Sequence, residues 1–266
     1  MVVFDDLSTG HREALRCELV VGDVRDEQAL RSVMAAHRFD AVMHFAAKSL
    51  VGESVTNPLL YYDVNVRGTI TLVAEMLRAD IPHIVFSSTC AVYGAPEQLP
   101  LAEDHPRHPM SPYGLSKRMV EEVLEAAGAQ HGLHYASLRY FNAAGAHPDG
   151  TLGESHDPET HLIPLAMDAI LGKRGRLKLF GRDYDTRDGT CLRDYIHVLD
   201  LARAHRLALD HLVAGAPGGA WNLGTGHGTT VLEVLQSLER VTGTPVPFDD
   251  AERRDGDPPG LYAAAE

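Results

Sequence analysis

The residues HIVFSSTCAVYG at positions 83–94 begin as an apolar run and end in two serines and a threonine, residues 87–89. The apolar side chains occupy both alternations of the run, which predicts a strand covered by helices on both faces. Two more predicted strands, at 2–4 and 40–47, also end in small or polar residues. Ligands of open α/β sheets bind at the carboxyl ends of the strands, so we expect a ligand site along this edge.

Strand and helix patterns alternate through the first half of the chain, which predicts a doubly wound parallel α/β sheet. After Asn142 the alternation of strand and helix patterns ends. Residues 143–161 form a predicted loop rich in Gly, Pro, His and Asp, and a smaller second domain follows. We place the first domain at 1–143 plus about 193–212, and the second at 144–192 plus 213–266. Predicted strands cover 2–4, 17–23, 40–47, 83–88, 134–142, 177–180 and 221–223, and predicted helices cover 26–37, 58–80, 111–131, 161–172 and 229–241.

The composition is that of an ordinary globular protein, with 266 residues, 44% of them apolar and 23% charged. A net charge of −13 argues against nucleic-acid binding, which needs a basic face. The chain shows no apolar run of about 18 residues and no signal-peptide pattern, so we expect no membrane contact. Three cysteines without CxxC spacing favour the cytoplasm. The 15 histidines form no HExxH motif or paired ligand set, so we expect no metal site.

Tyr113 and Lys117 lie four residues apart in the stretch SPYGLSK, so both side chains leave one face of a predicted helix. A tyrosine with its usual pKa of ~10 is a poor base, and a neighbouring ammonium would lower that pKa. The spacing alone is equally compatible with a solvated helix pair. Its place directly after the strand at 83–88 favours a catalytic pair.

A series of motifs along the whole chain resembles the extended short-chain dehydrogenase/reductase superfamily and, within it, the UDP-glucose 4-epimerase branch. The run RYFNAAGAHP followed by DGTCLRDYIHV is the part most specific to that branch. The motifs are FDDLSTGH (4–11), GDVRD (22–26), HFAAKSLVGESV (44–55), NVRGT (65–69), FSSTCAVYG (86–94), SPYGLSK (111–117), RYFNAAGAHPDG (139–150), HLIPL (161–165), FGRDYDTRDGTCLRDYIHVLDLA (180–202), NLGTGHG (222–228) and RRDGDPPG (253–260).

The resemblance implies a Rossmann-like NAD-binding domain followed by a UDP-sugar domain. It also implies that UDP-glucose and UDP-galactose are interconverted at C4 through a 4-keto sugar. Tyr113 would accept and return the proton, Lys117 would hold the nicotinamide ribose and depress the Tyr113 pKa, and Thr89 would hydrogen-bond the 4-oxygen. A homodimer through the helices at 69–79 and 112–127 is also implied.

The same resemblance assigns the binding residues. Asp5 would hold the adenosine ribose, Asp23 would flank the adenine, and Asn65 would buttress the strand end at 44–48. Arg193 and Arg254 would neutralise the UDP diphosphate. The full set of cofactor candidates is Asp5, Asp6, Ser8, Thr9, Gly10, Asp23, Val24, Phe45, Ala46, Ala47, Lys48, Asn65, Ser87, Tyr113, Lys117, Tyr140 and Phe141. The substrate candidates are Thr89, Asn142, His161, Leu162, Leu179 and Phe180 (the last two for the uracil), Arg193, Arg254, and Asp257 for the uridine ribose.

The chain departs from the family at its start. The first strand, the glycine loop and the first helix have no counterpart before Asp5, and the chain stops soon after Asp257. We therefore expect an interrupted sheet, a weakened hold on the NAD pyrophosphate, and a fragment or mis-started reading frame of a longer epimerase. A later stretch, WNLGTGHGTTVLEVL, has G-x-G-x-G spacing, and we expect it to be a structural turn of the second domain.

Other functions stay open at this point. Dehydratases of the superfamily carry an Asp-Glu pair after the strand-end threonine, whereas Cys90 and Ala91 follow it here. Leu261 is smaller than tyrosine, so an epimerase for UDP-N-acetylglucosamine is an alternative, as is another NAD-dependent nucleotide-sugar enzyme. The missing glycine loop favours a non-catalytic nucleotide sensor or an inactive fragment, and the presence of Tyr113 and Lys117 counts against both.

Overall fold

The computed structural model describes residues 1–254 and 257–264 of the chain, so Asp255 and Gly256 of the RRDGDPPG motif and the last two residues of the second predicted domain lie outside the described part. The chain forms two compact units. Unit 1 comprises Met1–Gly94, Glu103–Tyr140 and Ala202–Asn222, and unit 2 comprises Ala95–Ala102, Phe141–Leu201 and Leu223–Glu266. The segment that returns to unit 1 is therefore 202–222, about ten residues later than the predicted 193–212.

The main sheet of unit 1 has the strand order β10-β5-β4-β3. Strands β3, β4 and β5 are parallel, with His44 opposite Phe86 and Thr89 opposite Tyr140, so their carboxyl ends lie at one edge. This confirms the predicted parallel sheet. The strands are β3 (Ala41–His44), β4 (His83–Thr89), β5 (His134–Tyr140) and β10 (Gly219–Leu223).

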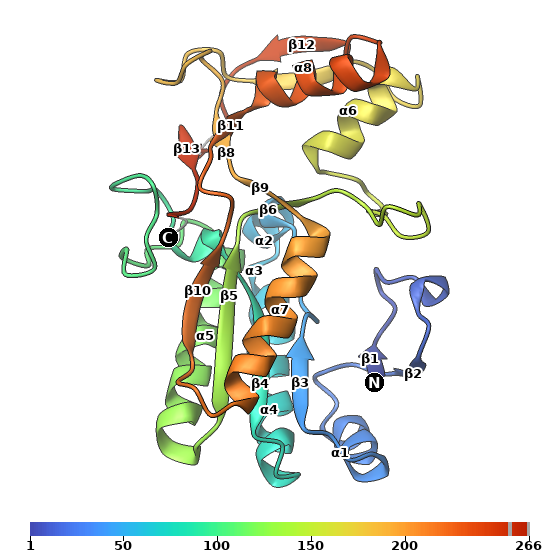
Figure 1. The fold of residues 1–266 in the computed structure, drawn as a ribbon, viewed down its shortest axis with the longest axis vertical. Coiled ribbons are helices and arrows are strands. Elements are labelled where there is room, and N and C mark those ends of the chain that lie inside the picture. The colour runs from blue at the N-terminus through green and yellow to red at the C-terminus, as the bar shows by residue number, and fades with distance from the viewer. Residues whose placement is uncertain (255–256, 265–266) are drawn as a thin grey trace. The chain divides into compact units, whose positions relative to one another are not determined.

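The first two strands form a separate parallel pair, β1 (Val2–Asp5) with β2 (Glu18–Val21). Figure 1 shows the interruption between β1 and β3. Among the described residues no ladder joins the two pieces, as the sequence led us to expect. Two residues attach the pair to the main core: Phe4 on β1 packs against it, and Leu30 on the following helix α1 (Glu27–Ala36) belongs to it.

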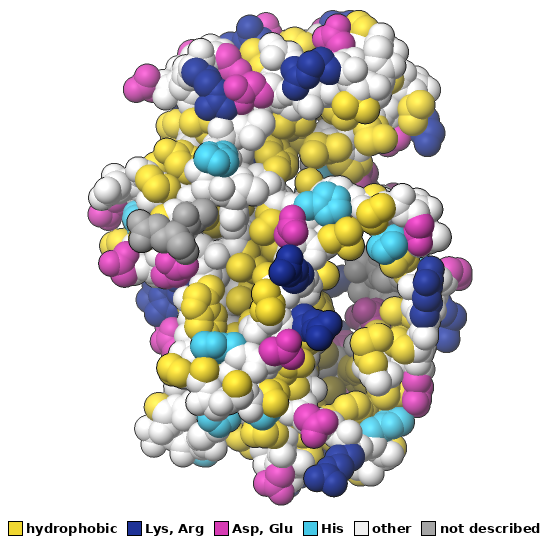
Figure 2. Space-filling view, viewed as in Figure 1, with side chains coloured by type: hydrophobic (Ala, Val, Ile, Leu, Met, Phe, Trp, Pro, Cys, Tyr) yellow, Lys and Arg dark blue, Asp and Glu magenta, His cyan; other side chains and the backbone are white. Residues whose placement is uncertain are grey.

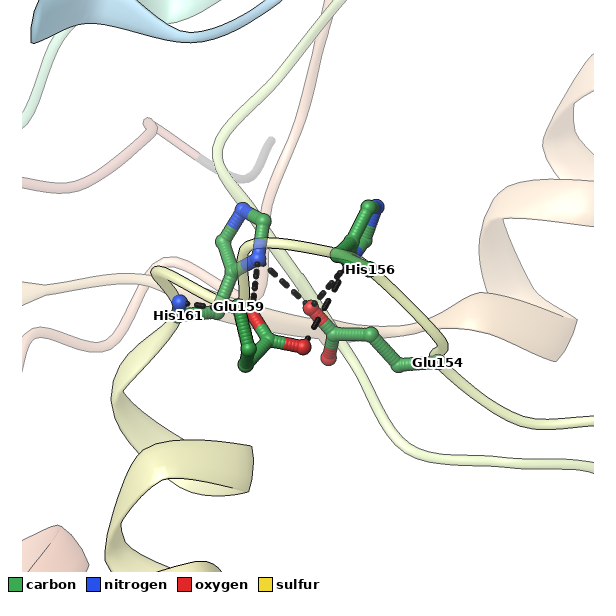
Figure 3. A group of neighbouring side chains, drawn as sticks. All are labelled: Glu154, His156, Glu159 and His161. Carbon is green, nitrogen blue, oxygen red and sulfur yellow. Dashed lines mark hydrogen bonds and ion pairs between the residues drawn. The ribbon is translucent and has the colours of Figure 1, made fainter. Parts of the chain in front are cut away.

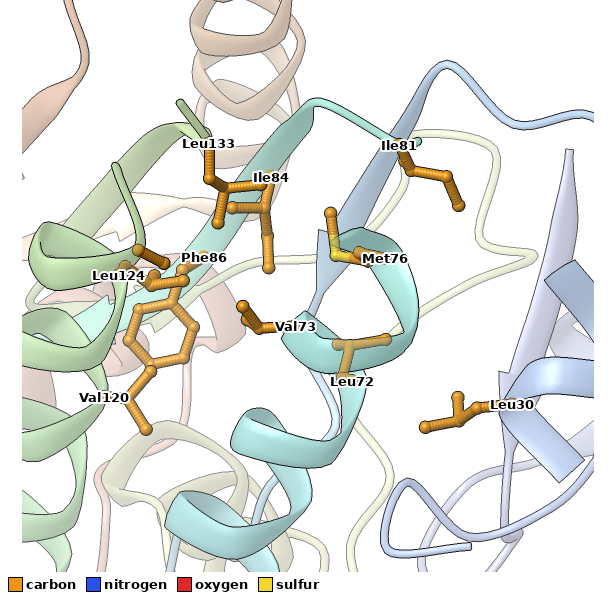
Figure 4. Close-up of a cluster of buried hydrophobic side chains, with 11 residues drawn as sticks. Leu30, Leu72, Val73, Met76, Ile81, Ile84, Phe86, Val120, Leu124 and Leu133 are labelled. Atoms are coloured by element: carbon orange, nitrogen blue, oxygen red, sulfur yellow. The ribbon is translucent and has the colours of Figure 1, made fainter. Parts of the chain in front are cut away.

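Helices cover both faces of the main sheet (Figure 1). On one face α5 (Pro112–His131) packs against β4 and β5, and α4 (Gly68–Arg78) shares a core cluster with α5 and β4. On the other lies α7 (Val198–Val213). This is the doubly wound arrangement. The core of unit 1, drawn in Figure 4, consists of Leu30, Leu72, Val73, Met76, Ile81, Ile84, Phe86, Val120, Leu124, Ala127 and Leu133.

The helix predicted over 58–80 is divided in the structure. It comprises α3 (Pro58–Tyr61), a π-helical segment at Tyr62–Arg67, and α4. A further helix, α2 (Val51–Thr56), precedes it and is missing from the prediction, because its six residues show too little periodicity to be recognised. Short π-helical segments are often found at functional sites, and this one carries Asn65. Two short 3-10 helices lie at Arg12–Ala14 and Cys90–Val92.

Unit 2 is built from short strands and two longer helices. Its core contains Ala166, Leu177, Leu235 and Val246, which join α6 and α8 to β7. The helices are α6 (Leu162–Ile170) and α8 (Val231–Thr242). The strand pairs are β7 (Leu177–Phe180) with β12 (Phe248–Ala251), and β6 (Asn142–Ala144) with β9 (Tyr195–His197). Strand β8 (Leu192–Arg193) lies between β11 (Thr229–Thr230) and β13 (Gly260–Leu261).

The surface carries charges of both signs. Figure 2 shows Lys and Arg side chains interspersed with Asp and Glu on the viewed face. In the described part of the chain, none of the helices has both the length and the apolar character that crossing a membrane requires.

Candidate active site

Tyr113 is held at the start of α5 by the cap of that helix. The Ser111 hydroxyl accepts a hydrogen bond from the Gly114 amide at 3.1 Å, and Pro112 occupies the first helical position, where it needs no amide donor. A Cβ added at Gly114 would lie 2.5 Å from the carbonyl oxygen of Ala91, so the helix start packs directly on the segment after β4. The cap therefore fixes Tyr113 next to the end of that strand.

Thr89, the last residue of β4, lies beside the Tyr113 hydroxyl, close enough to act on its pKa as a hydrogen-bond donor. The Thr89 oxygen accepts the Ala91 amide at 3.2 Å, a contact that does not use the Thr89 hydroxyl proton. Burial raises the pKa of Tyr113 above its ordinary value, and the hydrogen bond from Thr89 opposes that rise. The structure thus brings together two of the three predicted catalytic residues.

Lys117 follows one turn later on α5 and is 3% exposed. Its ammonium donates to the carbonyl oxygen of Ser87 at 2.9 Å and lies 4.8 Å from the centre of the Phe86 ring. Burial lowers the pKa of Lys117 to about 7, because an ammonium is poorly solvated there. Lys117 is therefore fixed at the carboxyl end of β4, as a catalytic role requires.

The predicted lowering of the Tyr113 pKa by Lys117 stays a prediction. In the chain by itself the pKa of Tyr113 is raised, and burial is the largest cause. Burial acts on both groups in the direction of their neutral forms, and the spacing in the sequence gives no measure of burial.

Asn65 connects three parts of unit 1 and is 2% exposed. Its side-chain oxygen accepts the Lys48 amide at 2.8 Å, and its nitrogen donates to the Lys48 carbonyl at 3.0 Å. The same nitrogen donates to the hydroxyl of Ser116 on α5 at 2.9 Å. Asn65 therefore fixes the segment after β3 against the helix that carries Tyr113, in line with its predicted buttressing role.

The segment after β1 forms a tight polar turn. Asp5 accepts the Leu7 amide at 2.7 Å, and Asp6 accepts the Ser8 amide at 2.8 Å. A Cβ added at Gly10 would lie 3.1 Å from an Asp5 carboxylate oxygen, so the turn closes tightly around that acid. The Lys48 ammonium reaches the Ser8 hydroxyl at 3.4 Å. Thr9 lies exposed in the same turn.

The other cofactor candidates differ in their burial and in their interaction partners. The Asp23 carboxylate is paired with Arg25, whose hydrogen bonds lower the pKa of Asp23. Val24 is buried. Phe45 is 54% exposed, with its ring 4.9 Å from that of His205 on α7. Ala46 and Ala47, which follow Phe45, are half-buried. Ser87 is hydrogen-bonded to Tyr140. Phe141 is buried and begins the second segment of unit 2.

A buried ion pair behind Tyr113 is missing from the sequence analysis. Glu121 on α5 is 1% exposed and accepts two hydrogen bonds from Arg139 on β5, at 2.9 and 2.7 Å. It also accepts the Ser88 hydroxyl at 2.5 Å. Burial alone would raise the pKa of Glu121, but the hydrogen bonds from Arg139 leave it lowered. This pair fastens α5 to β4 and β5.

In unit 2 the predicted phosphate and ribose residues contact one another. Arg193 on β8 is ion-paired with Asp257 and donates to the Pro258 carbonyl at 3.2 Å. The guanidinium of Arg254 lies 4.1 Å from the centre of the Phe180 ring at the end of β7. Leu179, which precedes Phe180, is 1% exposed and belongs to the interior.

The glycine-rich stretch at 222–228 is a structural turn, as predicted. The fully buried carboxylate of Asp194 accepts the amides of Thr225 at 2.8 Å and Gly226 at 3.2 Å, and also that of Ala263 at 3.1 Å. A protein carboxylate thus takes the place that a bound phosphate has in a phosphate loop. The Asn142 amide donates to the Asp194 carbonyl at 2.9 Å, which places Asn142 beside this turn.

His161 and Leu162 lie where the long loop enters α6. The Nδ1 atom of His161 lies 2.6 Å from Glu154 and 3.0 Å from Glu159. Figure 3 shows that His156 joins this group. The sequence analysis overlooked the set because its spacing, E-x-H-x-x-E-x-H, is not one of the helical zinc patterns.

The comparisons with known proteins agree with this geometry. The family model described as "NAD dependent epimerase/dehydratase family" matches residues 1–224. The chain belongs to this family. The resemblance and the fold class inferred from the sequence motifs are both confirmed.

Individual members of the epimerase/dehydratase family are very similar to this chain. The UDP-glucose 4-epimerase of Rhizobium meliloti strain 1021 is 53% identical over 263 residues, which are 98% of this chain and 80% of that protein. The crystal structure of the Brucella ovis UDP-glucose 4-epimerase in complex with NAD matches with a TM-score of 0.97 at 50% identity, over 99% of this chain and 81% of that one. The enzyme of Bifidobacterium longum, in complex with NAD+ and UDP, matches with a TM-score of 0.92 at 38% identity, over 99% and 82%.

Proposed function

We propose that this chain interconverts UDP-glucose and UDP-galactose by epimerisation at C4 of the sugar, with NAD as the hydride carrier. The observation that carries the proposal is the placement of Tyr113 beside Thr89, one helical turn from the buried Lys117. An acid–base group, its hydrogen-bonding partner and a cation thus share the carboxyl end of β4.

The residues of unit 1 fit NAD. The Lys117 ammonium has three donors, of which the Ser87 carbonyl takes one, so ribose hydroxyls can accept the others. Asp5 accepts the Leu7 amide through Oδ1, and its second oxygen suits a ribose hydroxyl. When bound, NAD supplies a carrier that accepts and returns hydride. The proposed cofactor residues are those inferred from the motifs, with Asn65 acting through the backbone it positions.

The reaction needs only one protein group to move a proton. Tyr113 removes the proton of the 4-hydroxyl as hydride leaves C4, which gives the 4-keto sugar. Thr89 donates a hydrogen bond that stabilises negative charge on the Tyr113 oxygen, and a charged Lys117 acts in the same direction. Tyr113 returns the proton to the 4-oxygen when hydride returns to the other face of C4.

The UDP part is assigned to unit 2. We assign the diphosphate to Arg193 and Arg254, because guanidinium groups match phosphate oxygens in geometry and charge. The ribose is assigned to Asp257 and the uracil to Phe180. The Arg193–Asp257 and Arg254–Phe180 contacts support this assignment, since each holds an arginine in place beside another proposed ligand of UDP. The remaining proposed substrate residues are Asn142, His161, Leu162 and Leu179.

The test is direct. The purified chain is incubated with UDP-galactose and added NAD, and UDP-glucose is measured by chromatography. The proposal predicts conversion that depends on Tyr113, so Tyr113→Phe is the control variant. Binding of UDP-galactose without conversion would favour a nucleotide sensor, and neither binding nor conversion would favour an inactive fragment. Either result would overturn the proposal.

We further propose that the protein is a homodimer of the cytoplasm. The proposed dimer surface contains α4 and α5, and Ile70 on α4 is 48% exposed. On the preceding helices Val55 and Leu59 are 63% and 76% exposed. Light scattering should give twice the chain mass of 29.0 kDa, and Ile70→Glu should give the single mass. A monomer at all concentrations would contradict the dimer.

A further inference from the structure

The loop before α6 brings together four side chains that can ligate a metal ion. They are Glu154, His156, Glu159 and His161, and one ligand atom from each lies within 4.8 Å of all the others. Figure 3 shows the two carboxylates and the two imidazole rings pointing toward one another. The proposed epimerase reaction uses none of the first three, so the group needs an explanation of its own.

The distances in the group resemble those in a tetrahedral site. With metal–ligand bonds of about 2.0 Å, the ligand atoms of a tetrahedral zinc ion lie about 3.3 Å apart. The Nδ1 atom of His156 is 3.3 Å from Glu154 and 3.5 Å from Glu159. The Nδ1 atom of His161 is 2.6 and 3.0 Å from the same two residues. These four His–Glu distances lie near that value, while the ligand atoms as a set lie within 4.8 Å of one another, so an ion at the centre has to draw the most widely separated ligand atoms together.

The chemistry of the four ligands selects the kind of ion. Two carboxylates balance the charge of a divalent cation, whereas two imidazoles disfavour Ca²⁺ and Mg²⁺, which take oxygen ligands. All four ligands come from one stretch of eight residues, so little additional chain has to be ordered to assemble them.

We propose that Glu154, His156, Glu159 and His161 bind one divalent ion of the zinc class. The ion would fasten the loop at 154–161 to the start of α6, because His161 directly precedes the first residue of this helix. The amides of Thr160 and His161 already donate to Glu159 at 2.7 and 2.8 Å, so that carboxylate is held in place before an ion arrives. Three of the four ligands have no part in the proposed epimerase reaction, and only His161 is also a proposed substrate residue.

The first test measures binding of Zn²⁺ by equilibrium dialysis on the full chain. We expect one Zn²⁺ per chain in this site. Loss of a residue that only hydrogen-bonds to a metal ligand lowers metal affinity about 10–100-fold. Loss of a ligand itself should cost at least as much, so His156→Ala and Glu159→Gln should each weaken Zn²⁺ binding by at least about tenfold. His147→Ala is the matched control, since His147 is an exposed histidine of the same loop that pairs with Asp149 instead.

The second test uses the unmodified chain and Co²⁺, whose visible absorption distinguishes tetrahedral from octahedral coordination. An intense tetrahedral spectrum that Zn²⁺ abolishes, together with slower amide exchange at 154–161, supports the site. No stoichiometric binding, or equal binding by His156→Ala and the unmodified chain, would overturn the proposal. The four residues would then be an ion-pair cluster only.

Discussion

The ammonium of Lys117 donates to the carbonyl oxygen of Ser87 at 2.9 Å, which fixes a buried cation to the end of the strand that also carries Thr89. The lysine thus sits where a ligand of the parallel sheet would lie. Because burial lowers its pKa to about 7, the chain at neutral pH holds Lys117 in both protonation states. Charge at this position is therefore sensitive to whatever binds beside it.

Removal of the Tyr113 hydroxyl should abolish epimerisation. Tyr113→Phe keeps the ring and the helix but removes the proton acceptor, so kcat should fall by about 10²–10⁴. Tyr135→Phe is the control, because Tyr135 lies at the opposite end of β5 from Tyr140. Initial rates of UDP-glucose formation measure both variants. Equal activity of Tyr113→Phe and the unmodified chain would exclude Tyr113 as the base.

The buried Lys117 should make stability depend on pH. Its pKa is about 7 in the folded chain, compared with an ordinary value of 10.5, so between these values the unfolded chain binds the additional proton. Stability should therefore rise with pH from 7 to 10.5, by about 1 kcal/mol per pH unit from this group. Below pH 7 Lys117 is protonated in both the folded and the unfolded chain, and the full cost of burying its charge then lowers the free energy of unfolding.

Lys117→Met tests this dependence, because it keeps most of the volume without the charge. Urea unfolding at pH 7, 8 and 9 should show the variant more stable at pH 7, with the advantage shrinking as pH rises. An advantage that stays constant across this range would show that Lys117 is not protonated differently in the two states.

The Glu121–Arg139 pair should be a main source of stability for α5. Glu121→Gln leaves the guanidinium of Arg139, which is 3% exposed, without its charge partner. The expected loss is about 3–5 kcal/mol of unfolding free energy. Glu122→Gln, one residue along, breaks an exposed pair with Arg118 and should cost less than about 1 kcal/mol. Similar losses in the two variants by urea unfolding would count against the buried pair.

Asn65 should act on cofactor binding through the backbone it holds. Asn65→Ala removes hydrogen bonds to the Lys48 amide and carbonyl, so it should cost about 1–3 kcal/mol of stability. It should also raise the KM for NAD more than it lowers kcat, because it displaces binding residues and not Tyr113. Thr71→Ala on the exposed side of α4 is the control. A fall in kcat with an unchanged KM would contradict this positioning role.

The sequence was sufficient for the fold class and for placing Tyr113 and Lys117 on one helix. Strand and helix periodicity gave the doubly wound sheet, and the four-residue spacing of Tyr113 and Lys117 placed both on one helix face. Burial of these two residues, which sets the direction of their pKa shifts, depends on packing that no local pattern records.

Other features arise only from distant contacts. Glu121 and Arg139 are 18 residues apart in the chain, and although Arg139 begins the RYFNAAGAHPDG motif, nothing in the sequence pairs it with Glu121. Asp194 was part of a recognised motif, but its role as the partner of the glycine turn at 222–228 becomes visible only when the two segments meet. The group of Glu154, His156, Glu159 and His161 lies in a loop. Its spacing does not match the zinc-binding patterns known for helices, so nothing in the sequence pointed to it.

The measurement that tests the central claim most directly follows the hydrogen on C4 of the sugar. UDP-galactose deuterated at C4 is converted by the chain in ordinary water with NAD, and the UDP-glucose formed is examined by mass spectrometry and NMR. The account predicts that deuterium is retained at C4, because the hydride that leaves this carbon returns to it while Tyr113 carries only the exchangeable proton. Product with hydrogen from water at C4 would contradict it.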